Sequence, residues 1–135
     1  MSKRIDLATA QKIIAAGIVK ADAINCPMNI AVADEGGNLV AHVRMDGAWI
    51  GSIDISIKKA YTSRAFNIKT SDLAANSQPT HQFFGIHASN DGKIMIFAGG
   101  IPLKDENGHV VGAVGVSGGS GAQDETVAEA AAIAF

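Results

Sequence analysis

The most informative stretch of the chain is Gly112-Ala113-Val114-Gly115-Val116-Ser117-Gly118-Gly119-Ser120-Gly121, followed by Asp124. It runs from an apolar strand through a glycine-rich loop into a helix. Backbone N–H groups in such a loop and the positive end of the helix dipole favour an anion. We therefore expect a ligand contact at Gly115, Ser117, Gly118 and Gly119. The alternative is a tight strand-to-helix turn, with glycines where the backbone packs closely and Asp124 as a cap.

The same stretch excludes two common site types. No Gly-Lys-Ser/Thr follows the glycines, so the loop is not a P-loop. Gly115-Val116-Ser117-Gly118-Gly119 matches the nucleophile-elbow pattern, but that fold places its histidine after the serine. The last histidine here is His109, which argues against a serine hydrolase.

The elements on either side of this stretch alternate between helical and strand patterns. Apolar residues at helical spacing predict helices over 7–24, with Asp6 as N-cap, and over 50–66, and Thr70-Ser71-Asp72 opens a short third helix. Turn signals at 34–38 and 105–108 separate apolar runs. The expected strands are 28–33, 39–45, 93–98, 101–104 and 109–116, and a last, Ala-rich helix covers 124–135. This order predicts an α+β fold, a five-stranded antiparallel sheet with helices packed on it.

Composition limits the class of protein. The 135 residues suit a single domain over 1–135, with 47% apolar and 18% charged residues. A net charge of −2 with scattered cations gives no footprint for nucleic acid, and no apolar run is long enough to span a membrane. Lys3 and Arg4 precede an amphipathic stretch rather than an apolar signal core, so we expect a cytoplasmic protein.

Cys26 is the only cysteine, which excludes an internal disulfide and paired-cysteine metal frameworks. It precedes Pro27 at the end of the first helix. A thiolate there can ligate haem iron, and the alternative is a half-buried cysteine before a helix-stopping proline.

Four histidines invite a metal hypothesis, but none forms a close H-x-H or H-x-x-x-H pair. His81 and His87 are the better candidates because they share an irregular segment with Phe83 and Phe84. Such a loop can form one side of a binding site for a flat apolar ligand. For each histidine the alternative is a surface or hydrogen-bonded side chain.

Arg44 and Asp46 stand beside the only tryptophan, at a strand-to-helix junction. Arg44 can pair a ligand carboxylate in a bidentate fashion, or equally it can pair with Asp46. We expect the cations on the next helix to be solvated, although one of them can face the same cleft: Lys58, Lys59 and Arg64.

Several blocks of the sequence together resemble the GlcG-like family, which includes the haem-binding protein HbpS and the C-terminal domain of PduO. The blocks, in family order, are Ile30–Gly37, Arg44–Ala48, Lys58–Thr62, Gly99–Leu103 and Gly112–Gly119. The resemblance implies a profilin-like fold, a five-stranded antiparallel sheet between helical layers, and compact homo-oligomers. It also implies haem binding in some members, and Cys26 falls where a haem-ligating cysteine has been proposed in PduO-like members. A partner histidine two residues earlier would strengthen that case, but this chain has Ile24 there. The adenosyltransferase activity of PduO belongs to a separate domain.

Three functional hypotheses follow. The first is a homo-oligomeric small-molecule-binding module, for haem or another tetrapyrrole, accessory to small-molecule catabolism. The second is an enzyme acting on a small carboxylic acid, with Arg44 as anchor, a histidine or Asp46 as proton carrier, and the Gly115–Gly119 amides as an oxyanion hole. The third is a structural subunit of a catabolic complex.

Overall fold

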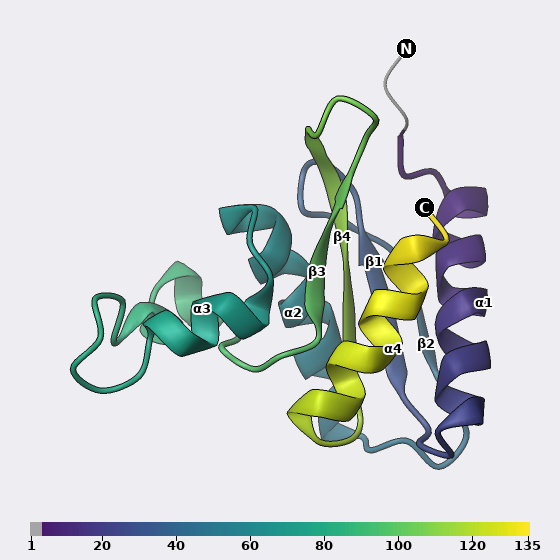
Figure 1. Cartoon of the computed structure of the whole chain (residues 1–135), viewed down its shortest axis with the longest axis horizontal. Coiled ribbons are helices and arrows are strands. Elements are labelled where there is room, and N and C mark those ends of the chain that lie inside the picture. The colour runs from purple at the N-terminus through teal and green to yellow at the C-terminus, as the bar shows by residue number, and fades with distance from the viewer. Residues whose placement is uncertain (1–3) are drawn as a thin grey trace.

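The computed structural model describes residues 4–135, so Lys3 lies outside the described residues (Figure 1). In chain order the helices and strands are α1 Leu7–Ala23, β1 Asn29–Ala33, β2 Leu39–Arg44, α2 Gly51–Phe66, α3 Thr70–Asn76, β3 Gly100–Lys104, β4 Val110–Ser117 and α4 Gly121–Ile133. Two short 3₁₀ turns, Ile86–Ala88 and Asn90–Gly92, lie between α3 and β3.

The sheet confirms the α+β class but has four strands, in the order β2-β1-β4-β3 with every neighbouring pair antiparallel. The expected strand over 93–98 is wrong. Its backbone bonds to α2 instead, because Thr62 Oγ1 accepts from Met95 N at 2.8 Å and donates to Lys93 O at 3.3 Å. Ile94 is buried in this position, so the apolar pattern there reflects packing on a helix and not a strand.

The two faces of the sheet carry different cores. One face packs against α1 and α4 through branched apolar side chains, among them Ile13, Ile30, Val114 and Val127. On the other face Ala31, Ala33 and Ala60 form a much smaller cluster against α2 (Figure 1). The sheet therefore has one conventional apolar core and one face on which the helix backbone approaches very closely.

The close approach of α2 has a specific cause in β4. A Cβ on Gly115 would lie 2.1 Å from the carbonyl oxygen of Ser56, so only glycine fits at this position. The helix accordingly turns small side chains, Ser52 and Ser56, toward the sheet. Of the apolar residues that set the predicted helical pattern, Ile57 and Ala60 pack on this face, whereas Ile50 precedes α2 and is exposed.

Most predicted helix starts and ends are confirmed within a few residues. Asp6 caps α1 by accepting from Thr9 N at 2.8 Å. The last helix begins at Gly121 instead of Asp124, because Ser120 and Gln123 form a reciprocal capping box.

The two ends of the described chain lie close together, where Arg4 and Phe135 line the same small cavity. The loop that joins β4 to α4 lies at the opposite end of the sheet (Figure 1). α3 and the segment that follows it project away from the sheet on the α2 side.

Candidate functional site

One end of the sheet gathers most of the predicted site residues. The strand register pairs Asn29, the first residue of β1, with Arg44 at the end of β2 and with Ser117 at the end of β4. Residues that are distant in sequence thus meet at one end of the sheet. Two pockets open there, on opposite faces of the sheet.

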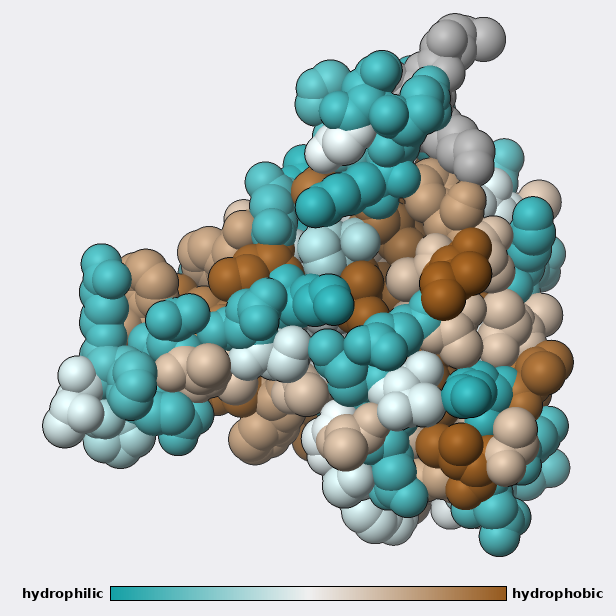
Figure 2. Space-filling view, viewed as in Figure 1, coloured by the Kyte–Doolittle hydropathy of each residue, from teal (hydrophilic) through white to brown (hydrophobic). Residues whose placement is uncertain are grey.

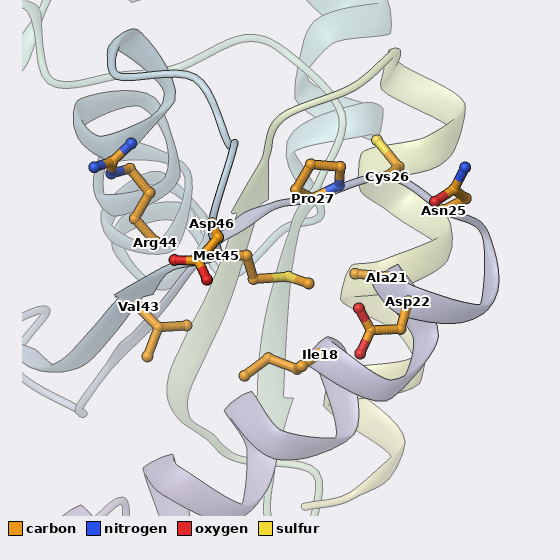
Figure 3. A pocket seen from close by; sticks show the side chains of 10 residues that line it. All are labelled: Ile18, Ala21, Asp22, Asn25, Cys26, Pro27, Val43, Arg44, Met45 and Asp46. Carbon is orange, nitrogen blue, oxygen red and sulfur yellow. The ribbon is translucent and has the colours of Figure 1, made fainter.

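The first, which we call the Cys26 pocket, has a volume of about 510 Å³ and lies between α1 and the end of β2 (Figure 3). Its lining residues are Ile18, Ala21, Asp22, Asn25, Cys26, Pro27, Val43, Arg44, Met45 and Asp46. The structure therefore brings together Cys26, Arg44 and Asp46, as a shared site requires. The exposed Arg44 side chain turns away from Cys26, and its Nη1 donates to the Ala48 carbonyl at 3.2 Å rather than to Asp46.

The Cys26 thiol is partly exposed and sits against the glycine loop. Its Sγ lies 3.9 Å from both Gly118 O and Gln123 Oε1, which makes it a weak donor to either. Burial raises the pKa of the Cys26 thiol, and the negative charge of Asp124 raises this pKa further. The free protein thus holds this cysteine as a neutral thiol near neutral pH.

The second, which we call the Lys59 pocket, has a volume of about 500 Å³ and lies between α2, the segment before β3 and the start of α4. Its lining residues are Trp49, Ser52, Ile55, Lys59, Ala74, Ile96, Phe97, Ala98, Ser117, Gly119, Gly121 and Asp124. Ser117 and Gly119 of the predicted glycine-loop site belong to this pocket.

A buried ion pair forms the polar floor of the Lys59 pocket. Lys59 Nζ lies 2.8 Å from Asp124 Oδ2 and also donates to the Val116 carbonyl at 2.8 Å. The other oxygen of Asp124, Oδ1, accepts from Gly118 N at 3.1 Å and from Gly119 N at 2.9 Å. Burial lowers the pKa of Lys59 and raises that of Asp124, while each partner opposes the shift of the other. The side chains of Lys59 and Asp124 together make four short hydrogen bonds, so we treat both as charged. The prediction that Lys59 is solvated is wrong.

Two serines and an asparagine continue the polar floor toward β1. Ser117 Oγ donates to Ser52 Oγ at 3.0 Å, and both side chains are buried. Asn29, which is opposite Ser117 in the register, donates from Nδ2 to the Trp49 carbonyl at 3.0 Å and so holds Trp49 at the pocket rim. The Asn29 Oδ1 atom is buried and has no partner among the described residues.

The glycines of the loop serve different purposes. Gly115 lies against α2 and reaches neither pocket. The amides of Gly118 and Gly119 already donate to Asp124, which therefore satisfies them from within the chain. The register places Asn29 opposite both Arg44 and Ser117, so the Arg44 side chain leaves the sheet on the same face as Ser117. The small-acid arrangement needs free loop amides beside Arg44, and the amides of Gly118 and Gly119 are not free.

The aromatic loop lies apart from both pockets. His81, Phe83, Phe84 and His87 are all exposed, in the segment that projects beyond α3 (Figure 1). The rings of Phe84 and His87 meet edge to face with centroids 6.4 Å apart, and His81 Nδ1 lies 3.3 Å from the Pro79 carbonyl. A ligand held by these residues would occupy a separate, open surface.

Sequence reasoning missed Lys59 and Ser52 as site residues. The available signal is the run of small polar residues and one lysine at Ser52, Ser56, Lys59 and Ser63, which recurs at helical spacing. Together with glycines in the facing strand, that spacing indicates a helix face that packs closely on a sheet. A lysine within such a face has to be buried with a counter-ion.

Residues 4–135 hold no group of three or more side chains arranged to bind a metal ion. None of the helices in this range has the length and apolar composition needed to cross a bilayer.

An antiparallel sheet with helices on both faces and two pockets at one edge defines a small α+β domain. The sequence matches the family described as haem-degrading protein HbpS-like over residues 5–133, and the chain belongs to this family. It is 43% identical over 131 residues to an uncharacterised 15.0 kDa protein from the dhaT-dhaS intergenic region of Citrobacter freundii, covering 97% of this chain and 92% of that one.

Two solved structures share the fold closely. The Klebsiella pneumoniae protein ORFY superposes with a TM-score of 0.95 at 38% identity, covering 100% of this chain and 92% of the other. A PduOC:heme complex superposes with a TM-score of 0.92 at 28% identity, covering 98% and 96%. The chain is also 33% identical over 89% of its length to the corrinoid adenosyltransferase PduO of Citrobacter freundii, but it spans only 36% of that protein.

Proposed function

We propose that this chain is a small cytoplasmic, homo-oligomeric module that binds haem without a covalent bond, in the Cys26 pocket, and that it is accessory to small-molecule catabolism. The observation that carries the proposal is a pocket of about 510 Å³ that has the partly exposed Cys26 among its lining residues. Similarity to a PduOC:heme complex and membership of a haem-degrading family support haem as the ligand.

The chemistry of the lining suits haem in most respects. Ile18, Val43 and Met45 offer apolar surface for a flat macrocycle, and Cys26 offers a sulfur ligand for the iron. Arg44 is the one cation among the described residues that line the pocket, but its guanidinium turns away from Cys26 toward the Ala48 carbonyl and would have to turn back to meet a propionate. When bound, haem would supply a redox-active iron centre, and the thiolate of Cys26 would be its protein ligand.

The charge of the rim works against tight binding. Asp22 and Asp46 also line the pocket, so two carboxylates accompany the single guanidinium of Arg44. Haem propionates carry negative charge, and like charges weaken their approach. Affinity therefore has to come from apolar contact and from the iron–sulfur bond.

Self-association has support in exposed apolar side chains at Val19 of α1 and Ile133 of α4. Apolar surface is scattered over the face that these two helices form (Figure 2). We expect size-exclusion chromatography with light scattering to give a mass that is a multiple of 13.9 kDa. A strictly monomeric mass at working concentration would contradict this part of the proposal.

The experiment that tests the ligand is a haem titration of the apoprotein followed by absorbance at the Soret band. The wild type is compared with Cys26→Ala, and with His81→Ala and His87→Ala as matched surface controls. We expect a saturable Soret shift that Cys26→Ala weakens at least about tenfold and that the histidine variants leave intact. A shift lost only in a histidine variant would move the site to the projecting segment. No shift in any protein would overturn haem binding and favour a structural subunit.

A further inference from the structure

The Lys59 pocket has no role in the proposed haem site, because the two open on opposite faces of the sheet and share no lining residue. Its floor contains a buried ion pair and a pair of hydrogen-bonded serines, all close to fully buried. We propose that this pocket is a second ligand site, which binds a small neutral compound that joins a carbonyl oxygen to a flat apolar body.

The hydrogen bonds of the floor determine what the ligand has to offer. Both oxygens of Asp124 are engaged, by Lys59 and by the two loop amides. An ammonium has three protons and the structure engages two of them, with Asp124 and Val116. The hydrogen bond between Ser117 and Ser52 uses one of their two hydroxyl protons, which leaves the other available. Among the residues that line the pocket, Lys59 and the two serines thus have donors to spare, and the partner they favour is a hydrogen-bond acceptor. The unpartnered acceptor nearby, Asn29 Oδ1, does not line the pocket.

The charges beside the floor determine that this acceptor is neutral. Among the described residues that line the pocket Lys59 is the one cation, and it lies near the carboxylates of both Asp124 and Glu125. Glu125 is held at the same place, because its oxygens accept from Gly99 N and from Ser71 Oγ, each at 3.0 Å. One positive and two negative charges disfavour an added anion where water is largely excluded. A ketone, aldehyde or amide oxygen fits this floor better than a carboxylate.

The apolar side walls of the pocket determine which kind of group the ligand carries beside its carbonyl. Trp49 and Phe97 line the pocket while remaining 62% and 56% exposed, and Ile55 and Ile96 complete the apolar surface. Exposed aromatic side chains beside a polar floor stack favourably on another flat apolar group. The volume of about 500 Å³ lies within the range of small-molecule sites.

The test uses acetophenone as the neutral probe and benzoate as its charged counterpart of similar shape. The chain has a single tryptophan, so the one indole N–H signal in a ¹⁵N-correlated NMR spectrum reports directly on the pocket rim. We expect acetophenone to shift this signal saturably, with a Kd on the order of 1 mM for a ligand of this size. Benzoate is expected to bind at least about fivefold more weakly.

Variants distinguish this site from the haem pocket. Ser52→Ala removes one of the two hydroxyls that together supply the free donor, and it is expected to weaken acetophenone binding by about 3- to 10-fold, the usual contribution of one hydrogen bond. Ala98→Phe fills the pocket and is expected to abolish the shift. Cys26→Ala is the matched control and is expected to leave acetophenone binding unchanged, while Ser52→Ala leaves haem binding unchanged.

Three outcomes would overturn the proposal. If acetophenone fails to shift the indole signal at a concentration 10-fold above the expected Kd, the pocket does not bind this class of ligand. Benzoate that binds as well as acetophenone refutes the charge argument. An unchanged affinity in folded Ser52→Ala refutes the donor argument, and one-dimensional NMR dispersion checks the fold of each variant independently.

Discussion

Lys59 Nζ and Asp124 Oδ2 lie 2.8 Å apart in the interior, with the two side chains only 1% and 6% exposed. The contact joins α2, on one face of the sheet, to α4, on the other. The amides of Gly118 and Gly119 also donate to Asp124, and the Val116 carbonyl also accepts from Lys59. Removal of either partner leaves the other charge buried without compensation.

Asp124→Ala is therefore expected to lower the free energy of unfolding by about 3–5 kcal/mol. The control is Asp54→Ala, which removes the exposed 2.9 Å pair with Lys58 and is expected to cost less than about 0.5 kcal/mol. Denaturant unfolding measures both. The double variant Lys59→Met/Asp124→Leu is expected to recover much of the loss. A cost below about 1 kcal/mol for Asp124→Ala would show that the pair is not a structural requirement.

Gly115→Ala is expected to cost at least about 1–3 kcal/mol, because its Cβ would meet the Ser56 carbonyl at 2.1 Å and force α2 away from the sheet. Gly51→Ala is the matched control, since a Cβ there meets nothing within 4 Å and the site begins a helix. This control is expected to stabilise by about 0.4–1 kcal/mol. Thermal or denaturant unfolding of the pair checks the prediction, and equal effects at the two glycines would contradict it.

Stability is expected to fall as the pH is lowered below about 6.5, the ordinary pKa of histidine. Burial lowers the pKa of His42, whose Nε2 is buried without a partner among the described residues. Below 6.5 the unfolded chain takes up a proton that the folded chain resists, so the slope is at most about 1.4 kcal/mol per pH unit from this residue. The difference in unfolding free energy between pH 7.5 and pH 5.5 is expected to shrink in His42→Gln. An unchanged pH dependence in that variant would assign the effect to other groups.

Haem affinity is expected to rise with pH, if Cys26 is the ligand as proposed. Burial raises the pKa of the thiol, and iron binds the thiolate, so binding releases a proton. Below the thiol pKa the apparent affinity is expected to increase by up to about tenfold per pH unit and then level off. Titrations between pH 6.5 and 9 measure this slope. Cys26→Ser is expected to flatten it, and a slope that survives this change would exclude the thiolate.

Asp46→Asn is expected to tighten haem binding by about two- to fivefold at low salt, because it removes one of the two carboxylates on the pocket rim. Arg44→Ala is expected to weaken binding by a smaller factor, because the Arg44 guanidinium turns away from Cys26 and donates to the Ala48 carbonyl. Both effects are expected to shrink in high salt, where exposed charges are screened. Absorbance titrations at two salt concentrations check the pair, and an opposite sign for either variant would contradict the charge argument.

The elements that follow local rules could be predicted from the sequence. α1 has an apolar stripe with a capping Asp6, and the two hairpin turns carry their glycines, so local chemistry determined them. The segment over 93–98 has the apolar pattern of a strand, yet its backbone groups bond to Thr62 on a helix. A tertiary partner of that kind leaves no mark in the local sequence.

The candidate site was predicted in part for the same reason. Cys26, Arg44 and Asp46 meet in one pocket because their segments flank neighbouring strands. Lys59 looked like an ordinary surface cation, since its burial depends on Asp124, which lies 65 residues later in the chain. Pairing over such a distance is a property of the folded sheet, and residue type alone did not distinguish Lys59 from Lys58.

The adjacent ends of the chain have a consequence for how the domain can be combined with others. Arg4 and Phe135 line one small cavity, and both pockets open at the far edge of the sheet. A short linker is thus expected to close the chain into a ring, and new termini at the exposed Glu106-Asn107 turn would give a circular permutant with both pockets intact. The same geometry lets the fold be joined to a larger polypeptide at either end while the end of the sheet with the two pockets stays clear.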